Sequence, residues 1–187
     1  PGGAVPIDAS GSSQFVSGLL LAGARFEHGL DLRHVGGTLP SRPHIELTVS
    51  MLRERGVEVT SARGQNRWIV APGAISAKDE AIEPDLINAA TFLAAPLIRG
   101  GSVSTPWPTH TAQAADAILA VLTALGADVV VRDGLVTVSG SGRVRGAHLD
   151  LTLTSELTCV AAGLLALADG PGSIRGVGHV RGHETDR

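Results

Sequence analysis

The stretch Asp8–Ala24, DASGSSQFVSGLLLAGA, places a cluster of hydrogen-bonding side chains directly before an almost wholly apolar run. A run of this composition predicts a helix that is buried on every side. Two further versions of the apolar segment begin at Ile87 (INAATFLAAPLI) and at Glu156 (ELTCVAAGLLALA), and each is followed by a glycine and a strand-like stretch. The chain is therefore expected to repeat one structural unit.

A second correspondence extends the repeat. MLRERGVEV, from Met51, resembles VLTALGADV, from Val121, and a hairpin-like stretch follows each of them. The unit then reads strand, apolar helix, strand, second helix, strand, strand. One copy covers roughly residues 4–72, a second roughly 78–140, and a third begins near Arg145. The predicted fold class is α/β (α+β), built from βαβαββ units.

The second helix of each unit is predicted to be one-sided. Apolar stripes at helical spacing run through both segments, with members Ile45, Thr48, Val49 and Leu52 in one and Ala114, Ala117, Ile118, Val121, Leu122 and Leu125 in the other. The stretch DVVVRDGLVTVSG predicts a hairpin that turns at Asp133-Gly134.

A polar segment, APGAISAKDEAIEP, separates the first copy from the second. We place a domain boundary there, near residue 82, which gives the domains 1–82 and 83–187. Neither end of the sequence carries an initiator, a signal peptide or a helix stop signal, so we expect a piece of a longer protein.

Composition excludes several classes of protein. The 187 residues carry a net charge of −3 without a run of Lys or Arg, which argues against nucleic-acid binding. No apolar stretch reaches the ~18 residues of a membrane span. The single cysteine, Cys159, excludes an internal disulfide and a cysteine-based zinc cluster, and it is expected to be a small core residue.

Two serine-led helix starts in the first copy carry the candidate chemistry. Ser13, preceded by Ser12, either caps its helix or presents a hydroxyl and backbone N–H groups to a phosphate. The local sequence alone favours capping. Ser41 leads a second helix start, where Arg42 adds positive charge and Pro43 suits the first turn. Both starts could converge on one anion.

The third copy carries a carboxylate at the corresponding place. Glu156, in LTSEL, either compensates the helix dipole or acts as a general base on a bound hydroxyl. The last stretch, HVRGHETDR from His179 to Arg187, is charged. On its own it reads slightly better as a solvated loop that opens a helix than as part of a site.

Five motifs occur in a fixed order along the chain: DASGSSQF, LPSRPHIELT, IEPDLINAATFLAA, DLTLTSELT and RGHETDR. Together they closely resemble the 5-enolpyruvylshikimate-3-phosphate (EPSP) synthase family, the 3-phosphoshikimate 1-carboxyvinyltransferases. SSQF alone is a weak signal, but SSQF joined to a distant ETDR is a specific one. The resemblance extends over the whole chain.

This resemblance implies a two-domain inverse α/β barrel of the enolpyruvyl transferase type, incomplete here. The chain would be the last unit of the first domain followed by one and a half units of the second. The implied activity is cytoplasmic: transfer of the enolpyruvyl group from phosphoenolpyruvate to the 5-hydroxyl of shikimate 3-phosphate, in aromatic amino acid biosynthesis. No metal or organic cofactor and no nucleic-acid or membrane partner is implied. The rest of the parent chain is needed to complete the site, so this piece alone is expected to be inactive.

Three alternatives stay open at this point. The sister enzyme that transfers enolpyruvyl to UDP-N-acetylglucosamine shares the repeat. RNA 3′-phosphate cyclases use related units, although the net charge counts against RNA. The piece could also be a non-catalytic fragment.

Carried over position by position, the resemblance implies a phosphate site in the first copy. Ser12, Ser13 and Ser41 correspond to ligands of the phosphate group of shikimate 3-phosphate. Gln14 corresponds to a residue that touches both substrates. His44 replaces an aromatic residue near the shikimate ring, which is a weaker inference.

The remaining correspondences concern proton transfer and the second substrate. Glu156 corresponds to the carboxylate that takes the proton from the 5-hydroxyl, and Glu184 to an acid that protonates the methylene carbon. His179 and His183 would contact the shikimate part, with potential pH dependence near neutrality at His183. Arg187 corresponds to an arginine that binds phosphoenolpyruvate.

Overall fold

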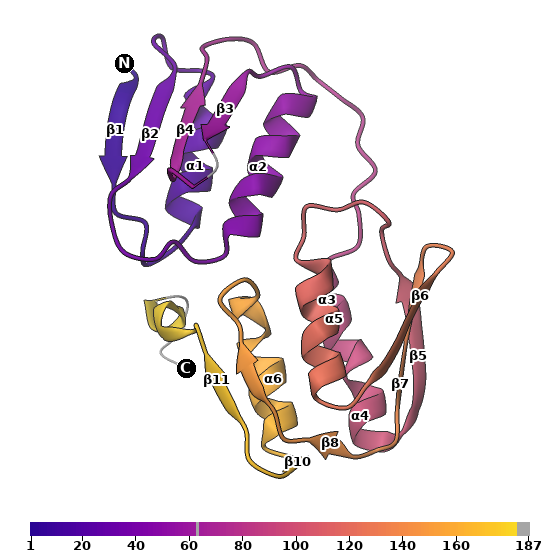
Figure 1. The fold of residues 1–187 in the computed structure, drawn as a ribbon. Helices are drawn as coiled ribbons and strands as arrows, with labels where there is room; N and C mark the ends of the chain where they lie inside the picture. The colour runs from indigo at the N-terminus through magenta and orange to yellow at the C-terminus, as the bar shows by residue number, and fades with distance from the viewer. Residues whose placement is uncertain (63, 183–187) are drawn as a thin grey trace. The chain divides into compact units, whose positions relative to one another are not determined.

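A computed structural model describes residues 1–62 and 64–182, which form two compact units (Figure 1). The first unit comprises residues 1–81 together with 179–182, and the second comprises 82–178. Residues 179–182, expected in the second range, thus group with the first unit. The assignment of 1–82 and 83–187 to two domains of a longer protein stays a prediction.

The first unit contains one complete βαβαββ repeat, as the sequence predicts. Its elements are β1 (Gly3–Ile7), α1 (Gln14–Gly23), β2 (Leu30–His34), α2 (Arg42–Glu54), β3 (Val59–Ala62) and β4 (Arg67–Val70). The strands form one sheet in the order β1-β2-β4-β3. Strands β1 and β2 are parallel, whereas β4 is antiparallel to both β2 and β3.

Side-chain alternation along β2 decides which face of this sheet is covered. Leu30 and Leu32 are buried, and Arg33 between Leu32 and His34 is exposed. The inward residues share one core with Val16 and Leu20 of α1, and with further residues of α2. Both helices therefore pack on the same face of the sheet, as short connections between neighbouring strands favour.

The second helices bury one stripe each, as predicted. Ile45, Val49 and Leu52 are the buried residues of α2. In the second unit α5 (Ala115–Ala124) buries Ile118, Val121 and Leu122. The exposed positions, which include Met51 and Arg53 of α2 and Asp116 and Thr123 of α5, lie outside these stripes.

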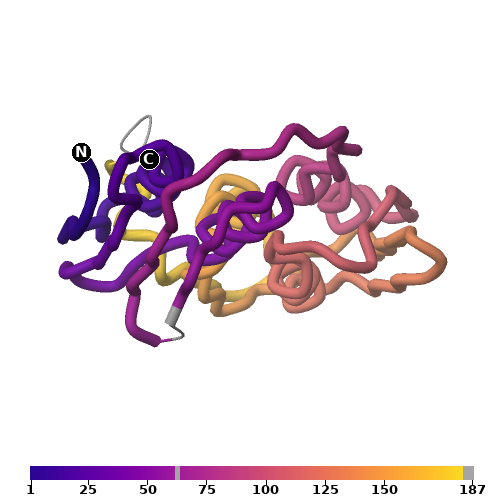
Figure 2. The backbone as a smooth tube through the Cα atoms, turned by 90° about the horizontal axis from the view of Figure 1, so that it is seen from above, coloured from indigo at the N-terminus to yellow at the C-terminus, as the bar shows by residue number. Residues whose placement is uncertain are grey.

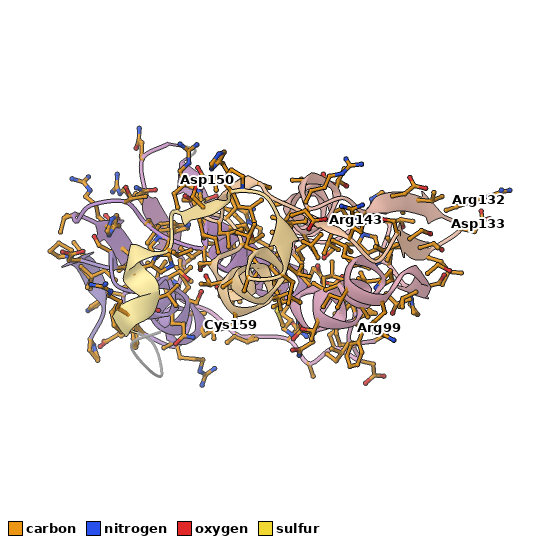
Figure 3. All side chains as sticks on the ribbon, turned by 90° about the horizontal axis from the view of Figure 1, so that it is seen from below. Arg99, Arg132, Asp133, Arg143, Asp150 and Cys159 are labelled. Carbon is orange, nitrogen blue, oxygen red and sulfur yellow. The ribbon has the colours of Figure 1, made fainter. Side chains whose placement is uncertain are left out.

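The predicted hairpin at Asp133-Gly134 is confirmed. It joins β6 (Asp128–Arg132) to β7 (Leu135–Gly140), and its tip is labelled in Figure 3. Asp133 and Gly134 have φ values of 50° and 74°. A two-residue turn with positive φ at both positions matches the twist of the strands it connects.

The second unit departs from the repeat at its beginning. Residues 71–85 contain neither strand nor helix, and the trace of this segment in Figure 2 is uncoiled. The expected first strand of the second copy is therefore missing from the described chain. The apolar segment that follows is split into α3 (Leu86–Leu93) and α4 (Ala95–Arg99), because Pro96 cannot donate the hydrogen bond that would continue α3.

The remainder of the second unit contains short elements. The strand β5 (Gly101–Pro106) forms a sheet in the order β5-β7-β6. The other elements are β8 (Val144–Arg145), β9 (His148–Asp150), the 3-10 helix η1 (Ser155–Leu157), α6 (Thr158–Leu165), β10 (Ala168–Asp169), β11 (Ser173–Arg175) and the 3-10 helix η2 (Gly178–Gly182). Parallel pairing of β9 with β11 around α6 repeats the β1-α1-β2 arrangement.

Burial on every side, expected for the apolar helices, is wrong for the described chain. In α1, Phe15 is 57% exposed and Leu21 is 53% exposed. A single sheet can cover only one side of a helix, so the other apolar side stays in water here. Cys159 is likewise exposed on α6 (Figure 3), which corrects its expected place in the core.

Within the described residues no helix combines the length and apolar character required to cross a bilayer.

Candidate functional site

The two serine-led helices of the first unit begin at one edge of the sheet. Because β1 and β2 are parallel and each leads directly into a helix, α1 and α2 both start where these strands end (Figure 1). Helix starts carry unpaired N–H groups and partial positive charge. Two such starts at one edge suit a small anion.

Ser12, and not Ser13, provides the local capping contact at the start of α1. The N–H of Gln14 donates to Ser12 Oγ at 3.2 Å. Ser13 occupies the N-cap position, is 4% exposed, and makes no capping side-chain hydrogen bond in the described structure. The capping role that the local sequence favours for Ser13 is therefore wrong, because its neighbour fills that role.

Ser41 has an unusual backbone at the start of α2. Its φ and ψ are both 44°, in the left-handed region, and its side chain is buried without a capping hydrogen bond to the described part of α2. A non-glycine residue in this region costs on the order of 1 kcal/mol or more, and such residues cluster at functional sites. Pro43 lies in the first turn, as predicted.

The positive charge of Arg42 is already engaged. Its Nη1 donates to Asn66 Oδ1 at 2.8 Å, and its Nε lies 3.4 Å from Glu46 Oε1 one turn further along α2. Arg42 therefore orients the loop at Asn66 as well as adding charge near Ser41.

A polar contact joins α1 and α2 within their first two turns. Ser17 Oγ and Thr48 Oγ1 are hydrogen-bonded at 3.0 Å, and Thr48 also donates to the carbonyl of His44. Ser17 lies one turn after Ser13, so this bond fixes the two helices relative to each other close to the candidate site.

A tight turn at Asp8 sets the path of the chain into α1. Asp8 Oδ1 accepts the Ser10 N–H at 2.9 Å. A Cβ atom added to Gly36 would lie 1.9 Å from the same oxygen, so only glycine lets the following loop pass there. Interactions with Ser10 lower the pKa of the Asp8 carboxyl.

The same turn precedes Glu156 in the third copy. Asp150 Oδ1 accepts hydrogen bonds from the side chain and the N–H of Thr152, and these lower the pKa of Asp150 together with Arg175. A Cβ atom on Gly176 would lie 2.3 Å from Thr152 Oγ1. Asp8 and Asp150 thus occupy equivalent places before Gln14 and Glu156.

Glu156 lies in η1, directly before α6, and is partly exposed. Its neighbours Thr154 and Ser155 are buried. The hydroxyl of Thr158 donates to the carbonyl of Ser155, which ties η1 to α6. This arrangement presents the Glu156 carboxylate at a helix start, where either of its predicted roles is chemically possible.

The described site residues fall in the two units. The first unit holds Ser12, Ser13, Gln14, Ser41 and His44 at its helix starts, and His179 in η2. The second unit holds Glu156. The predicted residues His183, Glu184 and Arg187 lie outside the described residues.

Sequence reasoning missed the residues that support the helix starts. Asp8 and Asp150 stand at the same distance before Gln14 and Glu156, and this repeated spacing could have identified them. No such spacing identifies His34, whose ring is hydrogen-bonded to the backbone of Ala9 and of Gly37.

Among the described residues, no group of three or more histidine, cysteine, aspartate or glutamate side chains could hold a metal ion.

The fold is that of the enolpyruvyl transferases. The structure matches the enolpyruvyl transferase NikO from Streptomyces tendae with a TM-score of 0.68 and 21% identity, over 94% of this chain and 44% of that one. It matches EPSP synthase from Acinetobacter baumannii with a TM-score of 0.73 and 22% identity, over 99% of this chain and 42% of that one.

The sequence then defines the family within this fold. The family model of EPSP synthase (3-phosphoshikimate 1-carboxyvinyltransferase) matches residues 1–187, so the chain belongs to that family. A 3-phosphoshikimate 1-carboxyvinyltransferase from Kocuria rhizophila is 51% identical over 189 aligned residues, which cover 100% of this chain and 42% of the relative. The chain thus spans less than half the length of that relative.

Proposed function

We propose that this chain supplies the phosphate-binding part of an enzyme that transfers the enolpyruvyl group from phosphoenolpyruvate to shikimate 3-phosphate. Membership of the EPSP synthase family supports this reaction. The two alternative enzymes, the transferase that acts on UDP-N-acetylglucosamine and the RNA 3′-phosphate cyclase, would instead bind a nucleotide sugar or an RNA end at the same edge of the sheet of the first unit. The proposed location of the enzyme is the cytoplasm.

The observation that carries the proposal is the state of Ser13 and Ser41. Both lie at the start of a helix, and both are 4% exposed. Ser41 also holds a left-handed backbone. Hydroxyl groups at two helix starts on one edge of the sheet are suited to donate to phosphate oxygens.

In the proposed reaction, Glu156 takes the proton of the 5-hydroxyl while that oxygen forms a bond to C2 of phosphoenolpyruvate. Glu184 delivers a proton to C3, which completes a tetrahedral ketal. Loss of phosphate from C2 and of a proton from C3 then restores the carbon–carbon double bond. The reaction is thus an addition followed by an elimination, with proton transfers in both steps, and it needs no metal or organic cofactor.

The other predicted residues bind rather than transfer protons. Gln14 would contact both substrates, with His179 and His183 on the shikimate part. Arg187 would bind phosphoenolpyruvate through the N–H donors of its planar guanidinium group, which match carboxylate and phosphate oxygens in pairs. Further cations from the rest of the parent chain would complete the site. We therefore expect no turnover from this chain alone, and a rate near ~10 per second would contradict that expectation.

Calorimetric titration with shikimate 3-phosphate tests the phosphate site. Changing Ser12→Ala and Ser13→Ala together is expected to raise Kd by about tenfold or more, through lost charge-assisted hydrogen bonds. The matched control is Ser102→Ala with Ser104→Ala, two exposed serines of β5, which should leave Kd unchanged. Unaltered binding in the first variant would remove the phosphate assignment. Binding of UDP-N-acetylglucosamine instead of shikimate 3-phosphate would favour the sister reaction.

A further inference from the structure

A single buried histidine connects the two loops that lead to the serine-bearing helix starts. His34, the last residue of β2, is 7% exposed. Its Nδ1 accepts the N–H of Ala9 at 3.1 Å, and its Nε2 lies 2.7 Å from the carbonyl oxygen of Gly37. Ala9 belongs to the loop before α1, and Gly37 to the loop before α2.

The chemistry of the two partners fixes the state of the ring. A backbone N–H can only donate and a carbonyl oxygen can only accept. Nδ1 must therefore be unprotonated and Nε2 must carry the hydrogen, so His34 is neutral in this arrangement. A second proton on Nδ1 would remove the acceptor of a buried N–H, which is costly.

Both contacts extend to the candidate site through short backbone links. The carbonyl of Ala9 accepts the N–H of Ser12 at 3.2 Å, so the Ala9 residue is held at its N–H by His34 and at its carbonyl by Ser12. Gly37 is connected to Ser41 by three intervening residues. Gly36, directly before it, packs against Asp8 at a distance that only glycine permits.

Polar groups from three segments of the chain lie around His34. Asp8 follows β1, one residue before the Ala9 N–H that Nδ1 of His34 accepts. The N–H of His34 donates to the carbonyl of Asn66, which precedes β4. Arg42 of α2 donates to the Asn66 side chain. The imidazole thus lies within a hydrogen-bonded layer that includes both helix starts.

We propose that His34 is a positioning residue: its neutral ring holds the loops of Ser12 and Ser41 in the relative position that one phosphate group requires. This inference rests on the proposed function, because it assigns a supporting group to that same phosphate site. His34 is not expected to touch the substrate.

The test combines three variants of the chain with an NMR titration by shikimate 3-phosphate. His34→Leu removes both hydrogen bonds and is expected to raise Kd by about tenfold, because the loops must then be ordered on binding. His34→Asn keeps an acceptor near the position of Nδ1 and should recover most of that affinity, to within about threefold of the original. His28→Leu, at an exposed histidine before β2, is the matched control and should bind like the original chain.

Two outcomes of the binding titrations separate this proposal from the proposed function. If the original chain binds and His34→Leu binds equally well, the positioning role is overturned while the phosphate site stands. If the original chain binds neither shikimate 3-phosphate nor inorganic phosphate, the proposed function and this inference both fall. Nitrogen chemical shifts of the His34 ring give an answer that requires no variant: a hydrogen on Nδ1 at neutral pH overturns the proposal.

Discussion

Thr48 Oγ1 and Ser17 Oγ, 3.0 Å apart and hydrogen-bonded, join α2 to α1 one turn beyond the serine at the start of α1. Both helices also contribute apolar side chains to a shared core. A directional bond at this place fixes the rotation of each helix, and therefore where Ser13 and Ser41 lie.

Replacing Thr48 by valine should weaken this junction. Thr48→Val preserves shape and removes the hydroxyl, so we expect a loss of about 1 kcal/mol from the free energy of unfolding of the first unit. Thr123→Val is the control, because the hydroxyl of Thr123 in α5 donates to the carbonyl of Leu119, one turn earlier in the same helix. Urea unfolding of both variants measures the difference, and equal losses would contradict a role for the bond between helices.

Neighbouring leucines of α1 should respond very differently to truncation. Leu20 is fully buried and Leu21 is 53% exposed. Leu20→Ala is expected to lower the free energy of unfolding by about 2–5 kcal/mol, because apolar burial is lost and a cavity remains. Leu21→Ala should change stability by less than about 0.5 kcal/mol in this chain. Urea denaturation decides this, and a large loss at Leu21 would mean that the exposed apolar side of α1 is covered.

Acid should weaken the sheet of the first unit through Asp31. Arg67 holds both carboxylate oxygens of Asp31, at 2.7 and 2.6 Å, and this lowers the pKa of Asp31. A carboxyl whose pKa is lowered by folding contributes stability above its unfolded pKa, and that contribution is lost as the pH falls through the folded value. The loss is expected below about pH 4.

The measurement is the urea midpoint between pH 3 and pH 7. Asp31→Asn should lower the midpoint at neutral pH and make its decline in acid shallower than in the original chain. Asp128→Asn, at an exposed aspartate of β6, should leave the profile unchanged. An identical acid slope in the original chain and in Asp31→Asn would rule out this contribution.

The segment after β4 should be protected by an ion cluster. Lys78 Nζ lies 2.6 Å from Glu54 Oε2 and 3.5 Å from Glu80 Oε2, and Arg55 Nη2 also reaches Glu80 at 3.1 Å. This cluster holds the segment to the end of α2, although the segment has no regular structure of its own.

Glu54→Gln removes the nearest partner of Lys78. Tryptic cleavage after Lys78 should then be faster by about threefold, because cleavage follows the population of the open segment. High salt should speed cleavage of the original chain as well, through screening of exposed charges. Glu58→Gln, at an exposed neighbouring carboxylate, is the control. Equal cleavage rates in all three proteins would exclude the cluster as the cause of protection.

Local patterns determined much of this protein. The repeat predicted the βαβαββ order of the first unit, the stripes predicted the inner faces of α2 and α5, and Asp133-Gly134 predicted its hairpin. These features depend on side-chain periodicity and on allowed backbone angles, which neighbouring residues specify.

Only the tertiary structure decided which polar groups work together. Ser12 caps α1 in place of Ser13, Ser41 holds a left-handed backbone, and His34 bridges two loops. The predicted roles of Ser12, Ser13 and Ser41 as phosphate ligands stay predictions, as do those of Gln14 and Glu156. Hydrogen bonds between groups far apart in the chain depend on how strands and helices pack, and no local pattern encodes that packing.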